Sequence, residues 1–187
     1  MGHEGDIIRE LVTDHGEVEE MFREIERLPR GEKRRKLLAD QVTIELIRHS
    51  IAEEVHLYPA VREHLTDGDR IADKEIDDHA TAEQIMKELE GHDADDPEFD
   101  RLIDQLMMEI RSHIQDEEDN LFPALRLSCP EEELERLGDK ARHTKKTAPT
   151  RPHPAAPDKP PFNKLLAPGT GLVDRARDAL SGRGKEQ

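Results

Sequence analysis

The stretch HSIAEEVHLYPAV, residues 49–61, places a histidine and two glutamates on what is otherwise an apolar helical face. His49 and Glu53 are four residues apart, so in a helix they lie one turn apart on the same side. The same arrangement returns in HIQDEEDNLFPAL, residues 113–125. The two copies align without a gap, which predicts a duplicated helical hairpin.

The apolar residues around both copies follow helical spacing. Four long helices are expected, because apolar side chains recur every three or four residues and breakers such as LPRG (28–31) interrupt the pattern. The short connections favour antiparallel neighbours, so the predicted fold is an all-α, up-down-up-down four-helix bundle with an internal helical-hairpin duplication. The expected helices cover residues 6–28, 32–65, 70–90 and 96–127 of a domain spanning residues 1–129.

Prolines mark special places in this pattern. Pro59 and Pro123 fall inside the second and fourth predicted helices, each six residues after a motif glutamate. Because proline removes a backbone donor and its ring clashes with the preceding turn, a kink or an early helix end is expected at both. Asp96 before Pro97 predicts the capped start of the fourth helix.

The composition changes after the predicted bundle. A short helical extension is expected over residues 130–143, and residues 144–187 are predicted to form a proline-rich basic linker. Within that linker Leu172, Ala176 and Leu180 have the spacing of a short amphipathic helix, which would dock a partner or a membrane surface. The alternative is a mostly disordered, solubilising tail.

Charge and composition narrow the classes of function. The net charge is −16, yet residues 138–187 are net basic, so the part of the chain before Gly138 is more acidic than the total suggests. An acidic body repels phosphate backbones, so no nucleic-acid partner is expected. No apolar run approaches the roughly 20 residues of a membrane span, and the N-terminus does not resemble a signal peptide. Cys129 is the single cysteine, which excludes an internal disulfide and predicts a cytoplasmic protein.

Each long predicted helix carries a histidine on its apolar stripe, and two helices add a glutamate one turn on. An unpaired carboxylate in an apolar interior costs on the order of several kcal/mol, so these groups need a compensating charge. A pair of divalent or trivalent cations would supply it. The alternative is an internal His–Glu hydrogen-bond network without metal. The residues are His15, His49, Glu53, His79, His113 and Glu117.

With the EExxLYPA and EEDNLFPAL stretches, these six positions resemble the hemerythrin-like, or HHE cation-binding, family over about residues 4–127. The resemblance implies a four-helix bundle with a non-haem di-iron centre. It also implies that the four histidines are terminal ligands and that Glu53 and Glu117 bridge the two ions.

The donor types limit the choice of metal. Nitrogen and oxygen donors leave iron, manganese or zinc, and two iron ions are predicted, with manganese and zinc as alternatives. Two six-coordinate ions offer about 12 positions; the six side chains would fill about 8 and an oxo or hydroxo bridge about 2 more. About two positions would stay open to a small oxidant or to water.

Four further residues are candidate ligands or neighbours of the centre. Hemerythrins that carry oxygen have a second histidine on the third helix, one turn after the first, where this chain has Glu83. Glu83 is either a ligand, a group that orients His79, or a solvated charge, and Glu19 is its counterpart in the repeat. His56 is expected to be exposed or to support a ligand, whereas Tyr58 is either a packing residue or a phenolate near iron.

Two functions are compatible with this pattern. The first is a small redox protein whose di-iron centre disproportionates hydrogen peroxide or handles O₂ or nitric oxide. The second is a binding module without turnover that senses oxygen, nitric oxide or iron, or stores iron, and whose C-terminal tail docks a partner. An enzyme should keep its activity when the chain is cut after about Ala141, whereas a sensor should lose its output. A monomer or a weak dimer is expected.

Overall fold

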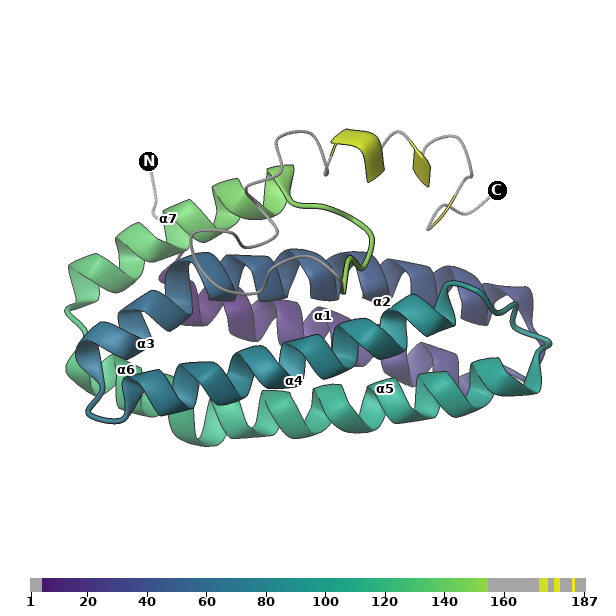
Figure 1. Ribbon diagram of the computed structural model, residues 1–187, viewed down its shortest axis with the longest axis horizontal. Coiled ribbons are helices and arrows are strands. Elements are labelled where there is room, and N and C mark those ends of the chain that lie inside the picture. The colour runs from purple at the N-terminus through teal and green to yellow at the C-terminus, as the bar shows by residue number, and fades with distance from the viewer. Residues whose placement is uncertain (1–4, 155–171, 175–176, 179–182, 184–187) are drawn as a thin grey trace.

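The computed structural model describes residues 5–154, 172–174, 177–178 and 183. Four long helices lie side by side along the molecule (Figure 1), and this confirms the predicted all-α four-helix bundle. Asp96 caps the last of the four long helices through the Glu98 backbone N–H, as predicted, and Asp6 caps the first by accepting a hydrogen bond from the Arg9 backbone N–H. The four helices are α1 (Ile7–Arg27), α2 (Lys33–Ala52), α4 (Gly68–Leu89) and α5 (Pro97–Asp116).

Two π-helical turns carry the motif glutamates. Helix α2 runs through η1 (Glu53–Leu57) into α3 (Tyr58–His64), and α5 runs through η2 (Glu117–Leu121) into α6 (Phe122–Ser128). The residue before each proline donates its backbone N–H to the carbonyl five residues back, on Glu53 and on Glu117. The helix therefore continues past each proline through one widened turn, which is the structural answer to a proline in mid-helix.

A further helix, α7 (Glu131–Thr147), lies across α1 and α2 (Figure 1). It is longer than the expected extension, and its final turn occupies positions assigned to the linker. Leu134, Leu137 and Ala141 are buried in the interior of the bundle, so α7 belongs to the domain. Gly138 permits this close approach, because a Cβ there would lie only 2.8 Å from the carbonyl oxygen of Gly5.

The hydrophobic core is divided into two clusters, and the four motif histidines belong to neither. One cluster joins the C-terminal parts of α1 and α4 to α2 and α5. The other joins the start of α1 to α3, α6 and α7. The first includes Phe22, Ile25, Leu46, Phe99 and Leu106, and the second Ile7, Leu11, Leu57, Val61 and Leu125.

The described part of the tail touches the bundle. Ala148 is buried in the first cluster, Arg151 lies 3.3 Å from Glu90, and Arg183 lies 3.3 Å from Asp40. Leu172 is helical and exposed, whereas Ala176, Leu180 and most of the predicted linker lie outside the described residues. Over the described ranges, no helix combines the length and the apolar character that a membrane span requires.

Candidate metal centre

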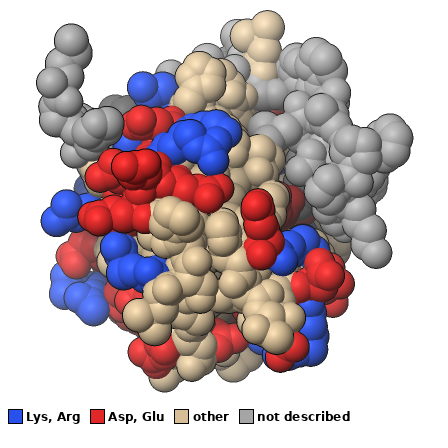
Figure 2. Space-filling view, turned by 90° about the vertical axis from the view of Figure 1, so that its left-hand side faces the viewer, with Lys and Arg blue, Asp and Glu red and all other residues tan. Residues whose placement is uncertain are grey.

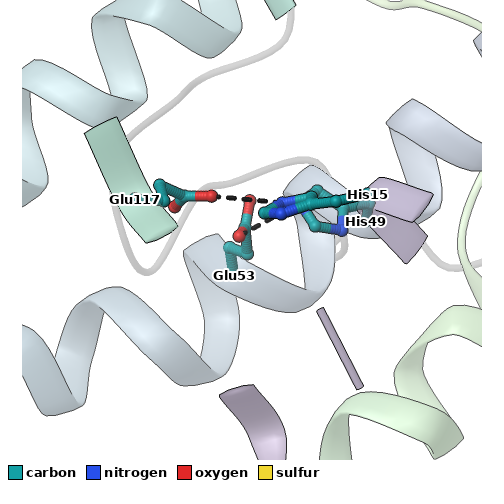
Figure 3. Close-up of side chains that lie close together, drawn as sticks. All are labelled: His15, His49, Glu53 and Glu117. Atoms are coloured by element: carbon teal, nitrogen blue, oxygen red, sulfur yellow. Dashed lines mark hydrogen bonds and ion pairs between the residues drawn. The ribbon is translucent and has the colours of Figure 1, made fainter. Parts of the chain in front are cut away.

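All six motif side chains meet in a buried layer inside the bundle. The histidines come from the four long helices, and each glutamate is the first residue of a π turn. Figure 3 shows the Glu53 and Glu117 carboxylates converging on the rings of His15 and His49. None of the six residues is more than 7% exposed: His15, His49, Glu53, His79, His113 and Glu117.

The histidines form two pairs. The Nε2 atoms of His15 and His49 face each other at 3.3 Å, and those of His79 and His113 do the same at 3.3 Å. Each pair joins the two long helices of one hairpin copy, α1 with α2 and α4 with α5. The repeat found in the sequence is therefore also a repeat in space.

The two glutamates lie between the pairs. Glu53 places Oε1 3.1 Å from Nε2 of His49 and Oε2 3.2 Å from Nε2 of His79. Glu117 places Oε2 3.4 Å from Nε2 of His15 and 3.4 Å from Nε2 of His113. Both carboxylates are shared by the two histidine pairs.

A carboxylate stands behind each imidazole at its Nδ1 atom. Glu118 lies 2.8 Å from Nδ1 of His15 and Glu54 lies 3.2 Å from Nδ1 of His79, so these two contacts are equivalent in the repeat. The other two contacts are not equivalent. They are Asp14, 3.1 Å from Nδ1 of His49, and Glu75, 2.9 Å from Nδ1 of His113.

Glu118, Asp14 and Glu54 are hydrogen-bonded to Nδ1 of their imidazoles and favour the tautomer that a metal needs, whereas Glu75 lies 2.9 Å from Nδ1 of His113 with no hydrogen bond between them. An imidazole that donates Nδ1–H to a carboxylate directs the lone pair of Nε2 away from that carboxylate, as in carboxylate–histidine–metal sites. Two Nε2–H groups cannot both point into a 3.3 Å gap, whereas a cation there would accept both lone pairs. Glu53 Oε1 and Glu117 Oε2 are buried and make no hydrogen bond, so they too fit a cation. The residues therefore suit metal better than a network of hydrogen bonds alone.

The shifted pKa values of the buried imidazoles and of Glu53 show that these groups interact strongly. Burial lowers the pKa of His49 and His79, but the carboxylates around them outweigh burial and raise the pKa to about 10 and about 9 respectively. Burial raises the pKa of Glu53, yet the two imidazoles hold it well below its usual range. In the absence of a cation, protons supply the positive charge that these buried carboxylates require.

Tyr58 also reaches this layer. Its hydroxyl lies 3.1 Å from Nε2 of His79, 3.5 Å from Glu53 Oε2 and 3.4 Å from Glu117 Oε1. Its counterpart in the repeat, Phe122, stacks on the ring of His15 with the centroids 5.8 Å apart. The histidine pairs therefore differ, since a hydroxyl faces one and an apolar ring covers the other.

The other three predicted neighbours lie elsewhere. Glu83 is 2% exposed, but its Oε1 accepts the backbone N–H of His153 at 2.7 Å, so the tail occupies this oxygen. Glu19 pairs with Arg23 and Arg111 toward the surface. His56 bonds to Thr144 of α7 at 2.8 Å.

The structural roles of Glu75 and Asp14 were not predicted from the sequence. Glu75 has a usable signal, because it precedes His79 by one helical turn and therefore shares its buried face. Asp14 has only a weak one, because an acidic residue next to a ligand is common on solvated helices. Its partner, His49, lies on another helix.

A small cavity lies beside the histidines. All four rings line it, with apolar walls that include Val18, Leu46 and Ile110. The space open to the centre of a water-sized molecule is about 20 Å³, enough for one small molecule. A cavity of this size suits a small ligand.

The fold and this layer define a class of protein: a helical bundle with a cation site in its core. A model of the hemerythrin HHE cation-binding domain matches residues 6–125. The chain belongs to this family, and its His and Glu clusters are the candidate cation ligands.

Individual relatives agree with the family. An uncharacterized hemerythrin-like protein of Schizosaccharomyces pombe is 32% identical over 142 residues, which are 75% of this chain and 70% of that protein. A DNA nickase of a Nostoc species is 28% identical over 130 residues, but these are only 35% of its length. The crystal structure of a hemerythrin HHE cation-binding domain-containing protein from Mycobacterium kansasii has a TM-score of 0.65 at 21% identity, covering 75% of this chain and 85% of that one.

Proposed function

We propose that this chain binds two iron ions between its two histidine pairs and reacts there with small oxidants, foremost hydrogen peroxide. The observation that carries this proposal is the position of Glu53, whose two oxygens face different pairs, at 3.1 Å from His49 and 3.2 Å from His79. A carboxylate in this position suits a bridge between two ions. Zinc has no redox chemistry, so iron suits a reaction with oxidants better.

In this role the four histidines would be terminal ligands, and Glu53 and Glu117 would hold both ions. Bound iron would supply Lewis acidity and a store of electrons. The chain's own residues supply the rest. The small cavity, walled in part by apolar side chains, would favour a small molecule. The Tyr58 hydroxyl can hold or donate a proton beside Glu53 Oε2 and His79 Nε2.

Lys145 of α7 links this helix to the histidine layer through Asp14. Its Nζ lies 2.5 Å from Oδ1 of Asp14, whose Oδ2 lies 3.1 Å from Nδ1 of His49. Burial raises the pKa of Asp14, but His49 and then the Lys145 ammonium outweigh burial and lower it, so Asp14 stays ionised beside the His49 ring. A helix outside the four-helix bundle thus supports a ligand inside it.

Metal content and peroxide consumption test the proposal together. Purified protein loaded with iron should hold about two irons per chain and release oxygen continuously when hydrogen peroxide is added in an oxygen-electrode cell. The Glu53→Ala/Glu117→Ala variant should do neither. A wild type that retains a single iron would contradict the bridged pair.

Iron binding without oxygen release would support the second candidate, a sensing or storage module. One observation favours that candidate: Glu83, four residues after His79, bonds to the backbone of His153 in the tail. The tail is therefore in contact with the helix that carries a ligand. Truncation after Thr147 separates the two functions, because a cut after Ala141 would also remove Lys145. An enzyme keeps its peroxide turnover without the tail, and a sensor loses its output.

The likeness to a DNA nickase does not lead us to propose a nucleic-acid substrate. The match covers 35% of that protein. Before Gly138, acidic side chains greatly outnumber basic ones in this chain, which opposes binding to a phosphate backbone.

A further inference from the structure

A second group of metal-type donors lies at the end of the bundle where α3, α6 and α7 meet. His64 is the last residue of α3, Cys129 caps α6, and Glu133 lies in the first turn of α7. Their donor atoms all lie within 4.8 Å of one another, and Nε2 of His64 is 3.2 Å from Oε2 of Glu133. Two distant parts of the chain, one ending at His64 and the other running from Cys129 to Glu133, thus bring an imidazole, a thiol and a carboxylate together.

The donor set points to a particular cation. Zinc binds thiolate, imidazole and carboxylate at about 2.0–2.3 Å in a tetrahedron, which places its ligand atoms about 3.3–3.8 Å apart. The observed separations need only small side-chain movements to reach this geometry. We propose that His64, Cys129 and Glu133 form a second metal site, distinct from the histidine layer, that binds Zn²⁺ with water in the fourth position.

The surroundings of the thiol favour a cation. Cys129 is 6% exposed, and its contact with the carbonyl oxygen of Pro130 is long, at 3.8 Å. The charges of Glu133 and Glu63 act on the thiol, and that of Arg136, which lies 3.1 Å from Glu133 Oε1, opposes them in part. Figure 2 looks onto this end of the bundle and shows acidic side chains gathered over part of it. His64 and Glu133 are partly exposed, so a cation can reach the site from solvent.

Binding there would have a structural consequence. Each proposed ligand terminates or begins a helix, so one ion would fasten the ends of α3 and α6 to the start of α7. Lys145 of α7 also supports Asp14. The bound ion would therefore restrain a helix that contacts the histidine layer.

Cobalt absorption tests the proposal without interference from the histidine layer. Cys129 is the only cysteine in the chain, so any thiolate-to-cobalt charge-transfer band must come from this residue. Titration of the reduced full-length protein with Co²⁺ should produce such a near-ultraviolet band, and addition of Zn²⁺ should abolish it. The band should be lost in Cys129→Ser and, at the Co²⁺ concentration that saturates the wild type, also in His64→Ala and Glu133→Gln.

Glu132→Gln is the matched control, since Glu132 is the exposed neighbour of Glu133 and should leave the band unchanged. If Cys129→Ser does not fold, the wild-type spectrum and the other two variants still decide the matter. A wild type without the band overturns the site. So does a band that survives both His64→Ala and Glu133→Gln, because the thiol would then bind cobalt without the proposed partners.

Discussion

Among individual residues, the outer carboxylates decide how the imidazoles are presented. Glu75 and Asp78 both lie near His113, but Glu75 is 2.9 Å from Nδ1 and buried, whereas Asp78 is 4.0 Å away and partly exposed. Symmetry with Asp14 would have assigned this role to Asp78. Packing assigns it to Glu75 instead, because a buried carboxylate at shorter distance interacts more strongly.

Glu75→Gln should therefore weaken metal binding by about 10–100-fold, the usual effect of losing a group that orients a ligand. Asp78→Asn is the matched control and should change the affinity little. Competition with a chromophoric chelator measures both. Equal losses in the two variants would show that the two carboxylates share the role.

The raised pKa values of His49 and His79 predict a dependence of stability on pH. A folded-state pKa of about 10 or about 9, above the ordinary value of 6.5, means that these groups stabilise the metal-free protein fully below pH 6.5. This contribution is lost as the pH rises through about 9 to 10. Urea unfolding of metal-free protein should thus show a falling free energy of unfolding between about pH 7 and pH 10.

Metal should reverse this trend, because a bound cation displaces the imidazole protons. The affinity for metal should increase as the pH rises over the same range, and binding should release protons that a pH-stat can count. An affinity independent of pH would mean that the imidazoles are already neutral, contrary to their surroundings.

Among the helices, the approach of α7 to the start of α1 depends on one glycine. In Gly138→Ala the new methyl group would meet the carbonyl oxygen of Gly5 at 2.8 Å and backbone atoms of Asp6 and Ile7 at 2.9 and 3.0 Å. Backbone cannot give way as a flexible side chain can. The substitution should lower the free energy of unfolding by about 1–3 kcal/mol, measured by urea titration.

Gly16→Ala is the control for this effect. A Cβ at Gly16 meets nothing within 4 Å, and alanine favours helix over glycine by about 1 kcal/mol. This variant should be as stable as the wild type or more so. Destabilisation by both substitutions would indicate a general intolerance of alanine rather than a steric contact at α7.

The π turns explain why Tyr58 reaches the metal layer. In an α-helix a residue five positions after Glu53 would point about 140° away from it. The π turn pairs the Tyr58 N–H with the Glu53 carbonyl, which brings these two residues onto the same side. Only then can the hydroxyl approach His79 and both glutamates.

For the molecule as a whole, the histidine layer should couple metal to global stability. A cation held at a free concentration about 1,000 times its dissociation constant stabilises the folded state by about 4 kcal/mol. Chelation should lower the melting temperature of the wild type and leave Glu53→Gln/Glu117→Gln unchanged, as followed by circular dichroism. A wild type insensitive to metal would favour the hydrogen-bonded network over the cation site.

The helices, the duplicated hairpin and the six side chains of the central layer could all be predicted from the order of the amino acids. This was possible because helical periodicity assigns each residue to a face of its helix. Charged groups that recur on an apolar face also need a shared compensating charge. The gapless alignment of the two copies already related His15 to His79 and His49 to His113.

The surroundings of that layer could not be predicted in this way, because they depend on tertiary packing. The choice of Glu75 over Asp78, the contact of Glu83 with the tail, and the meeting of His64, Cys129 and Glu133 all join segments far apart in the chain. The position of Tyr58 depends on a helical register that proline changes locally. Periodicity assumes an unbroken α-helix and carries no information about which helices become neighbours, so these features follow from packing alone.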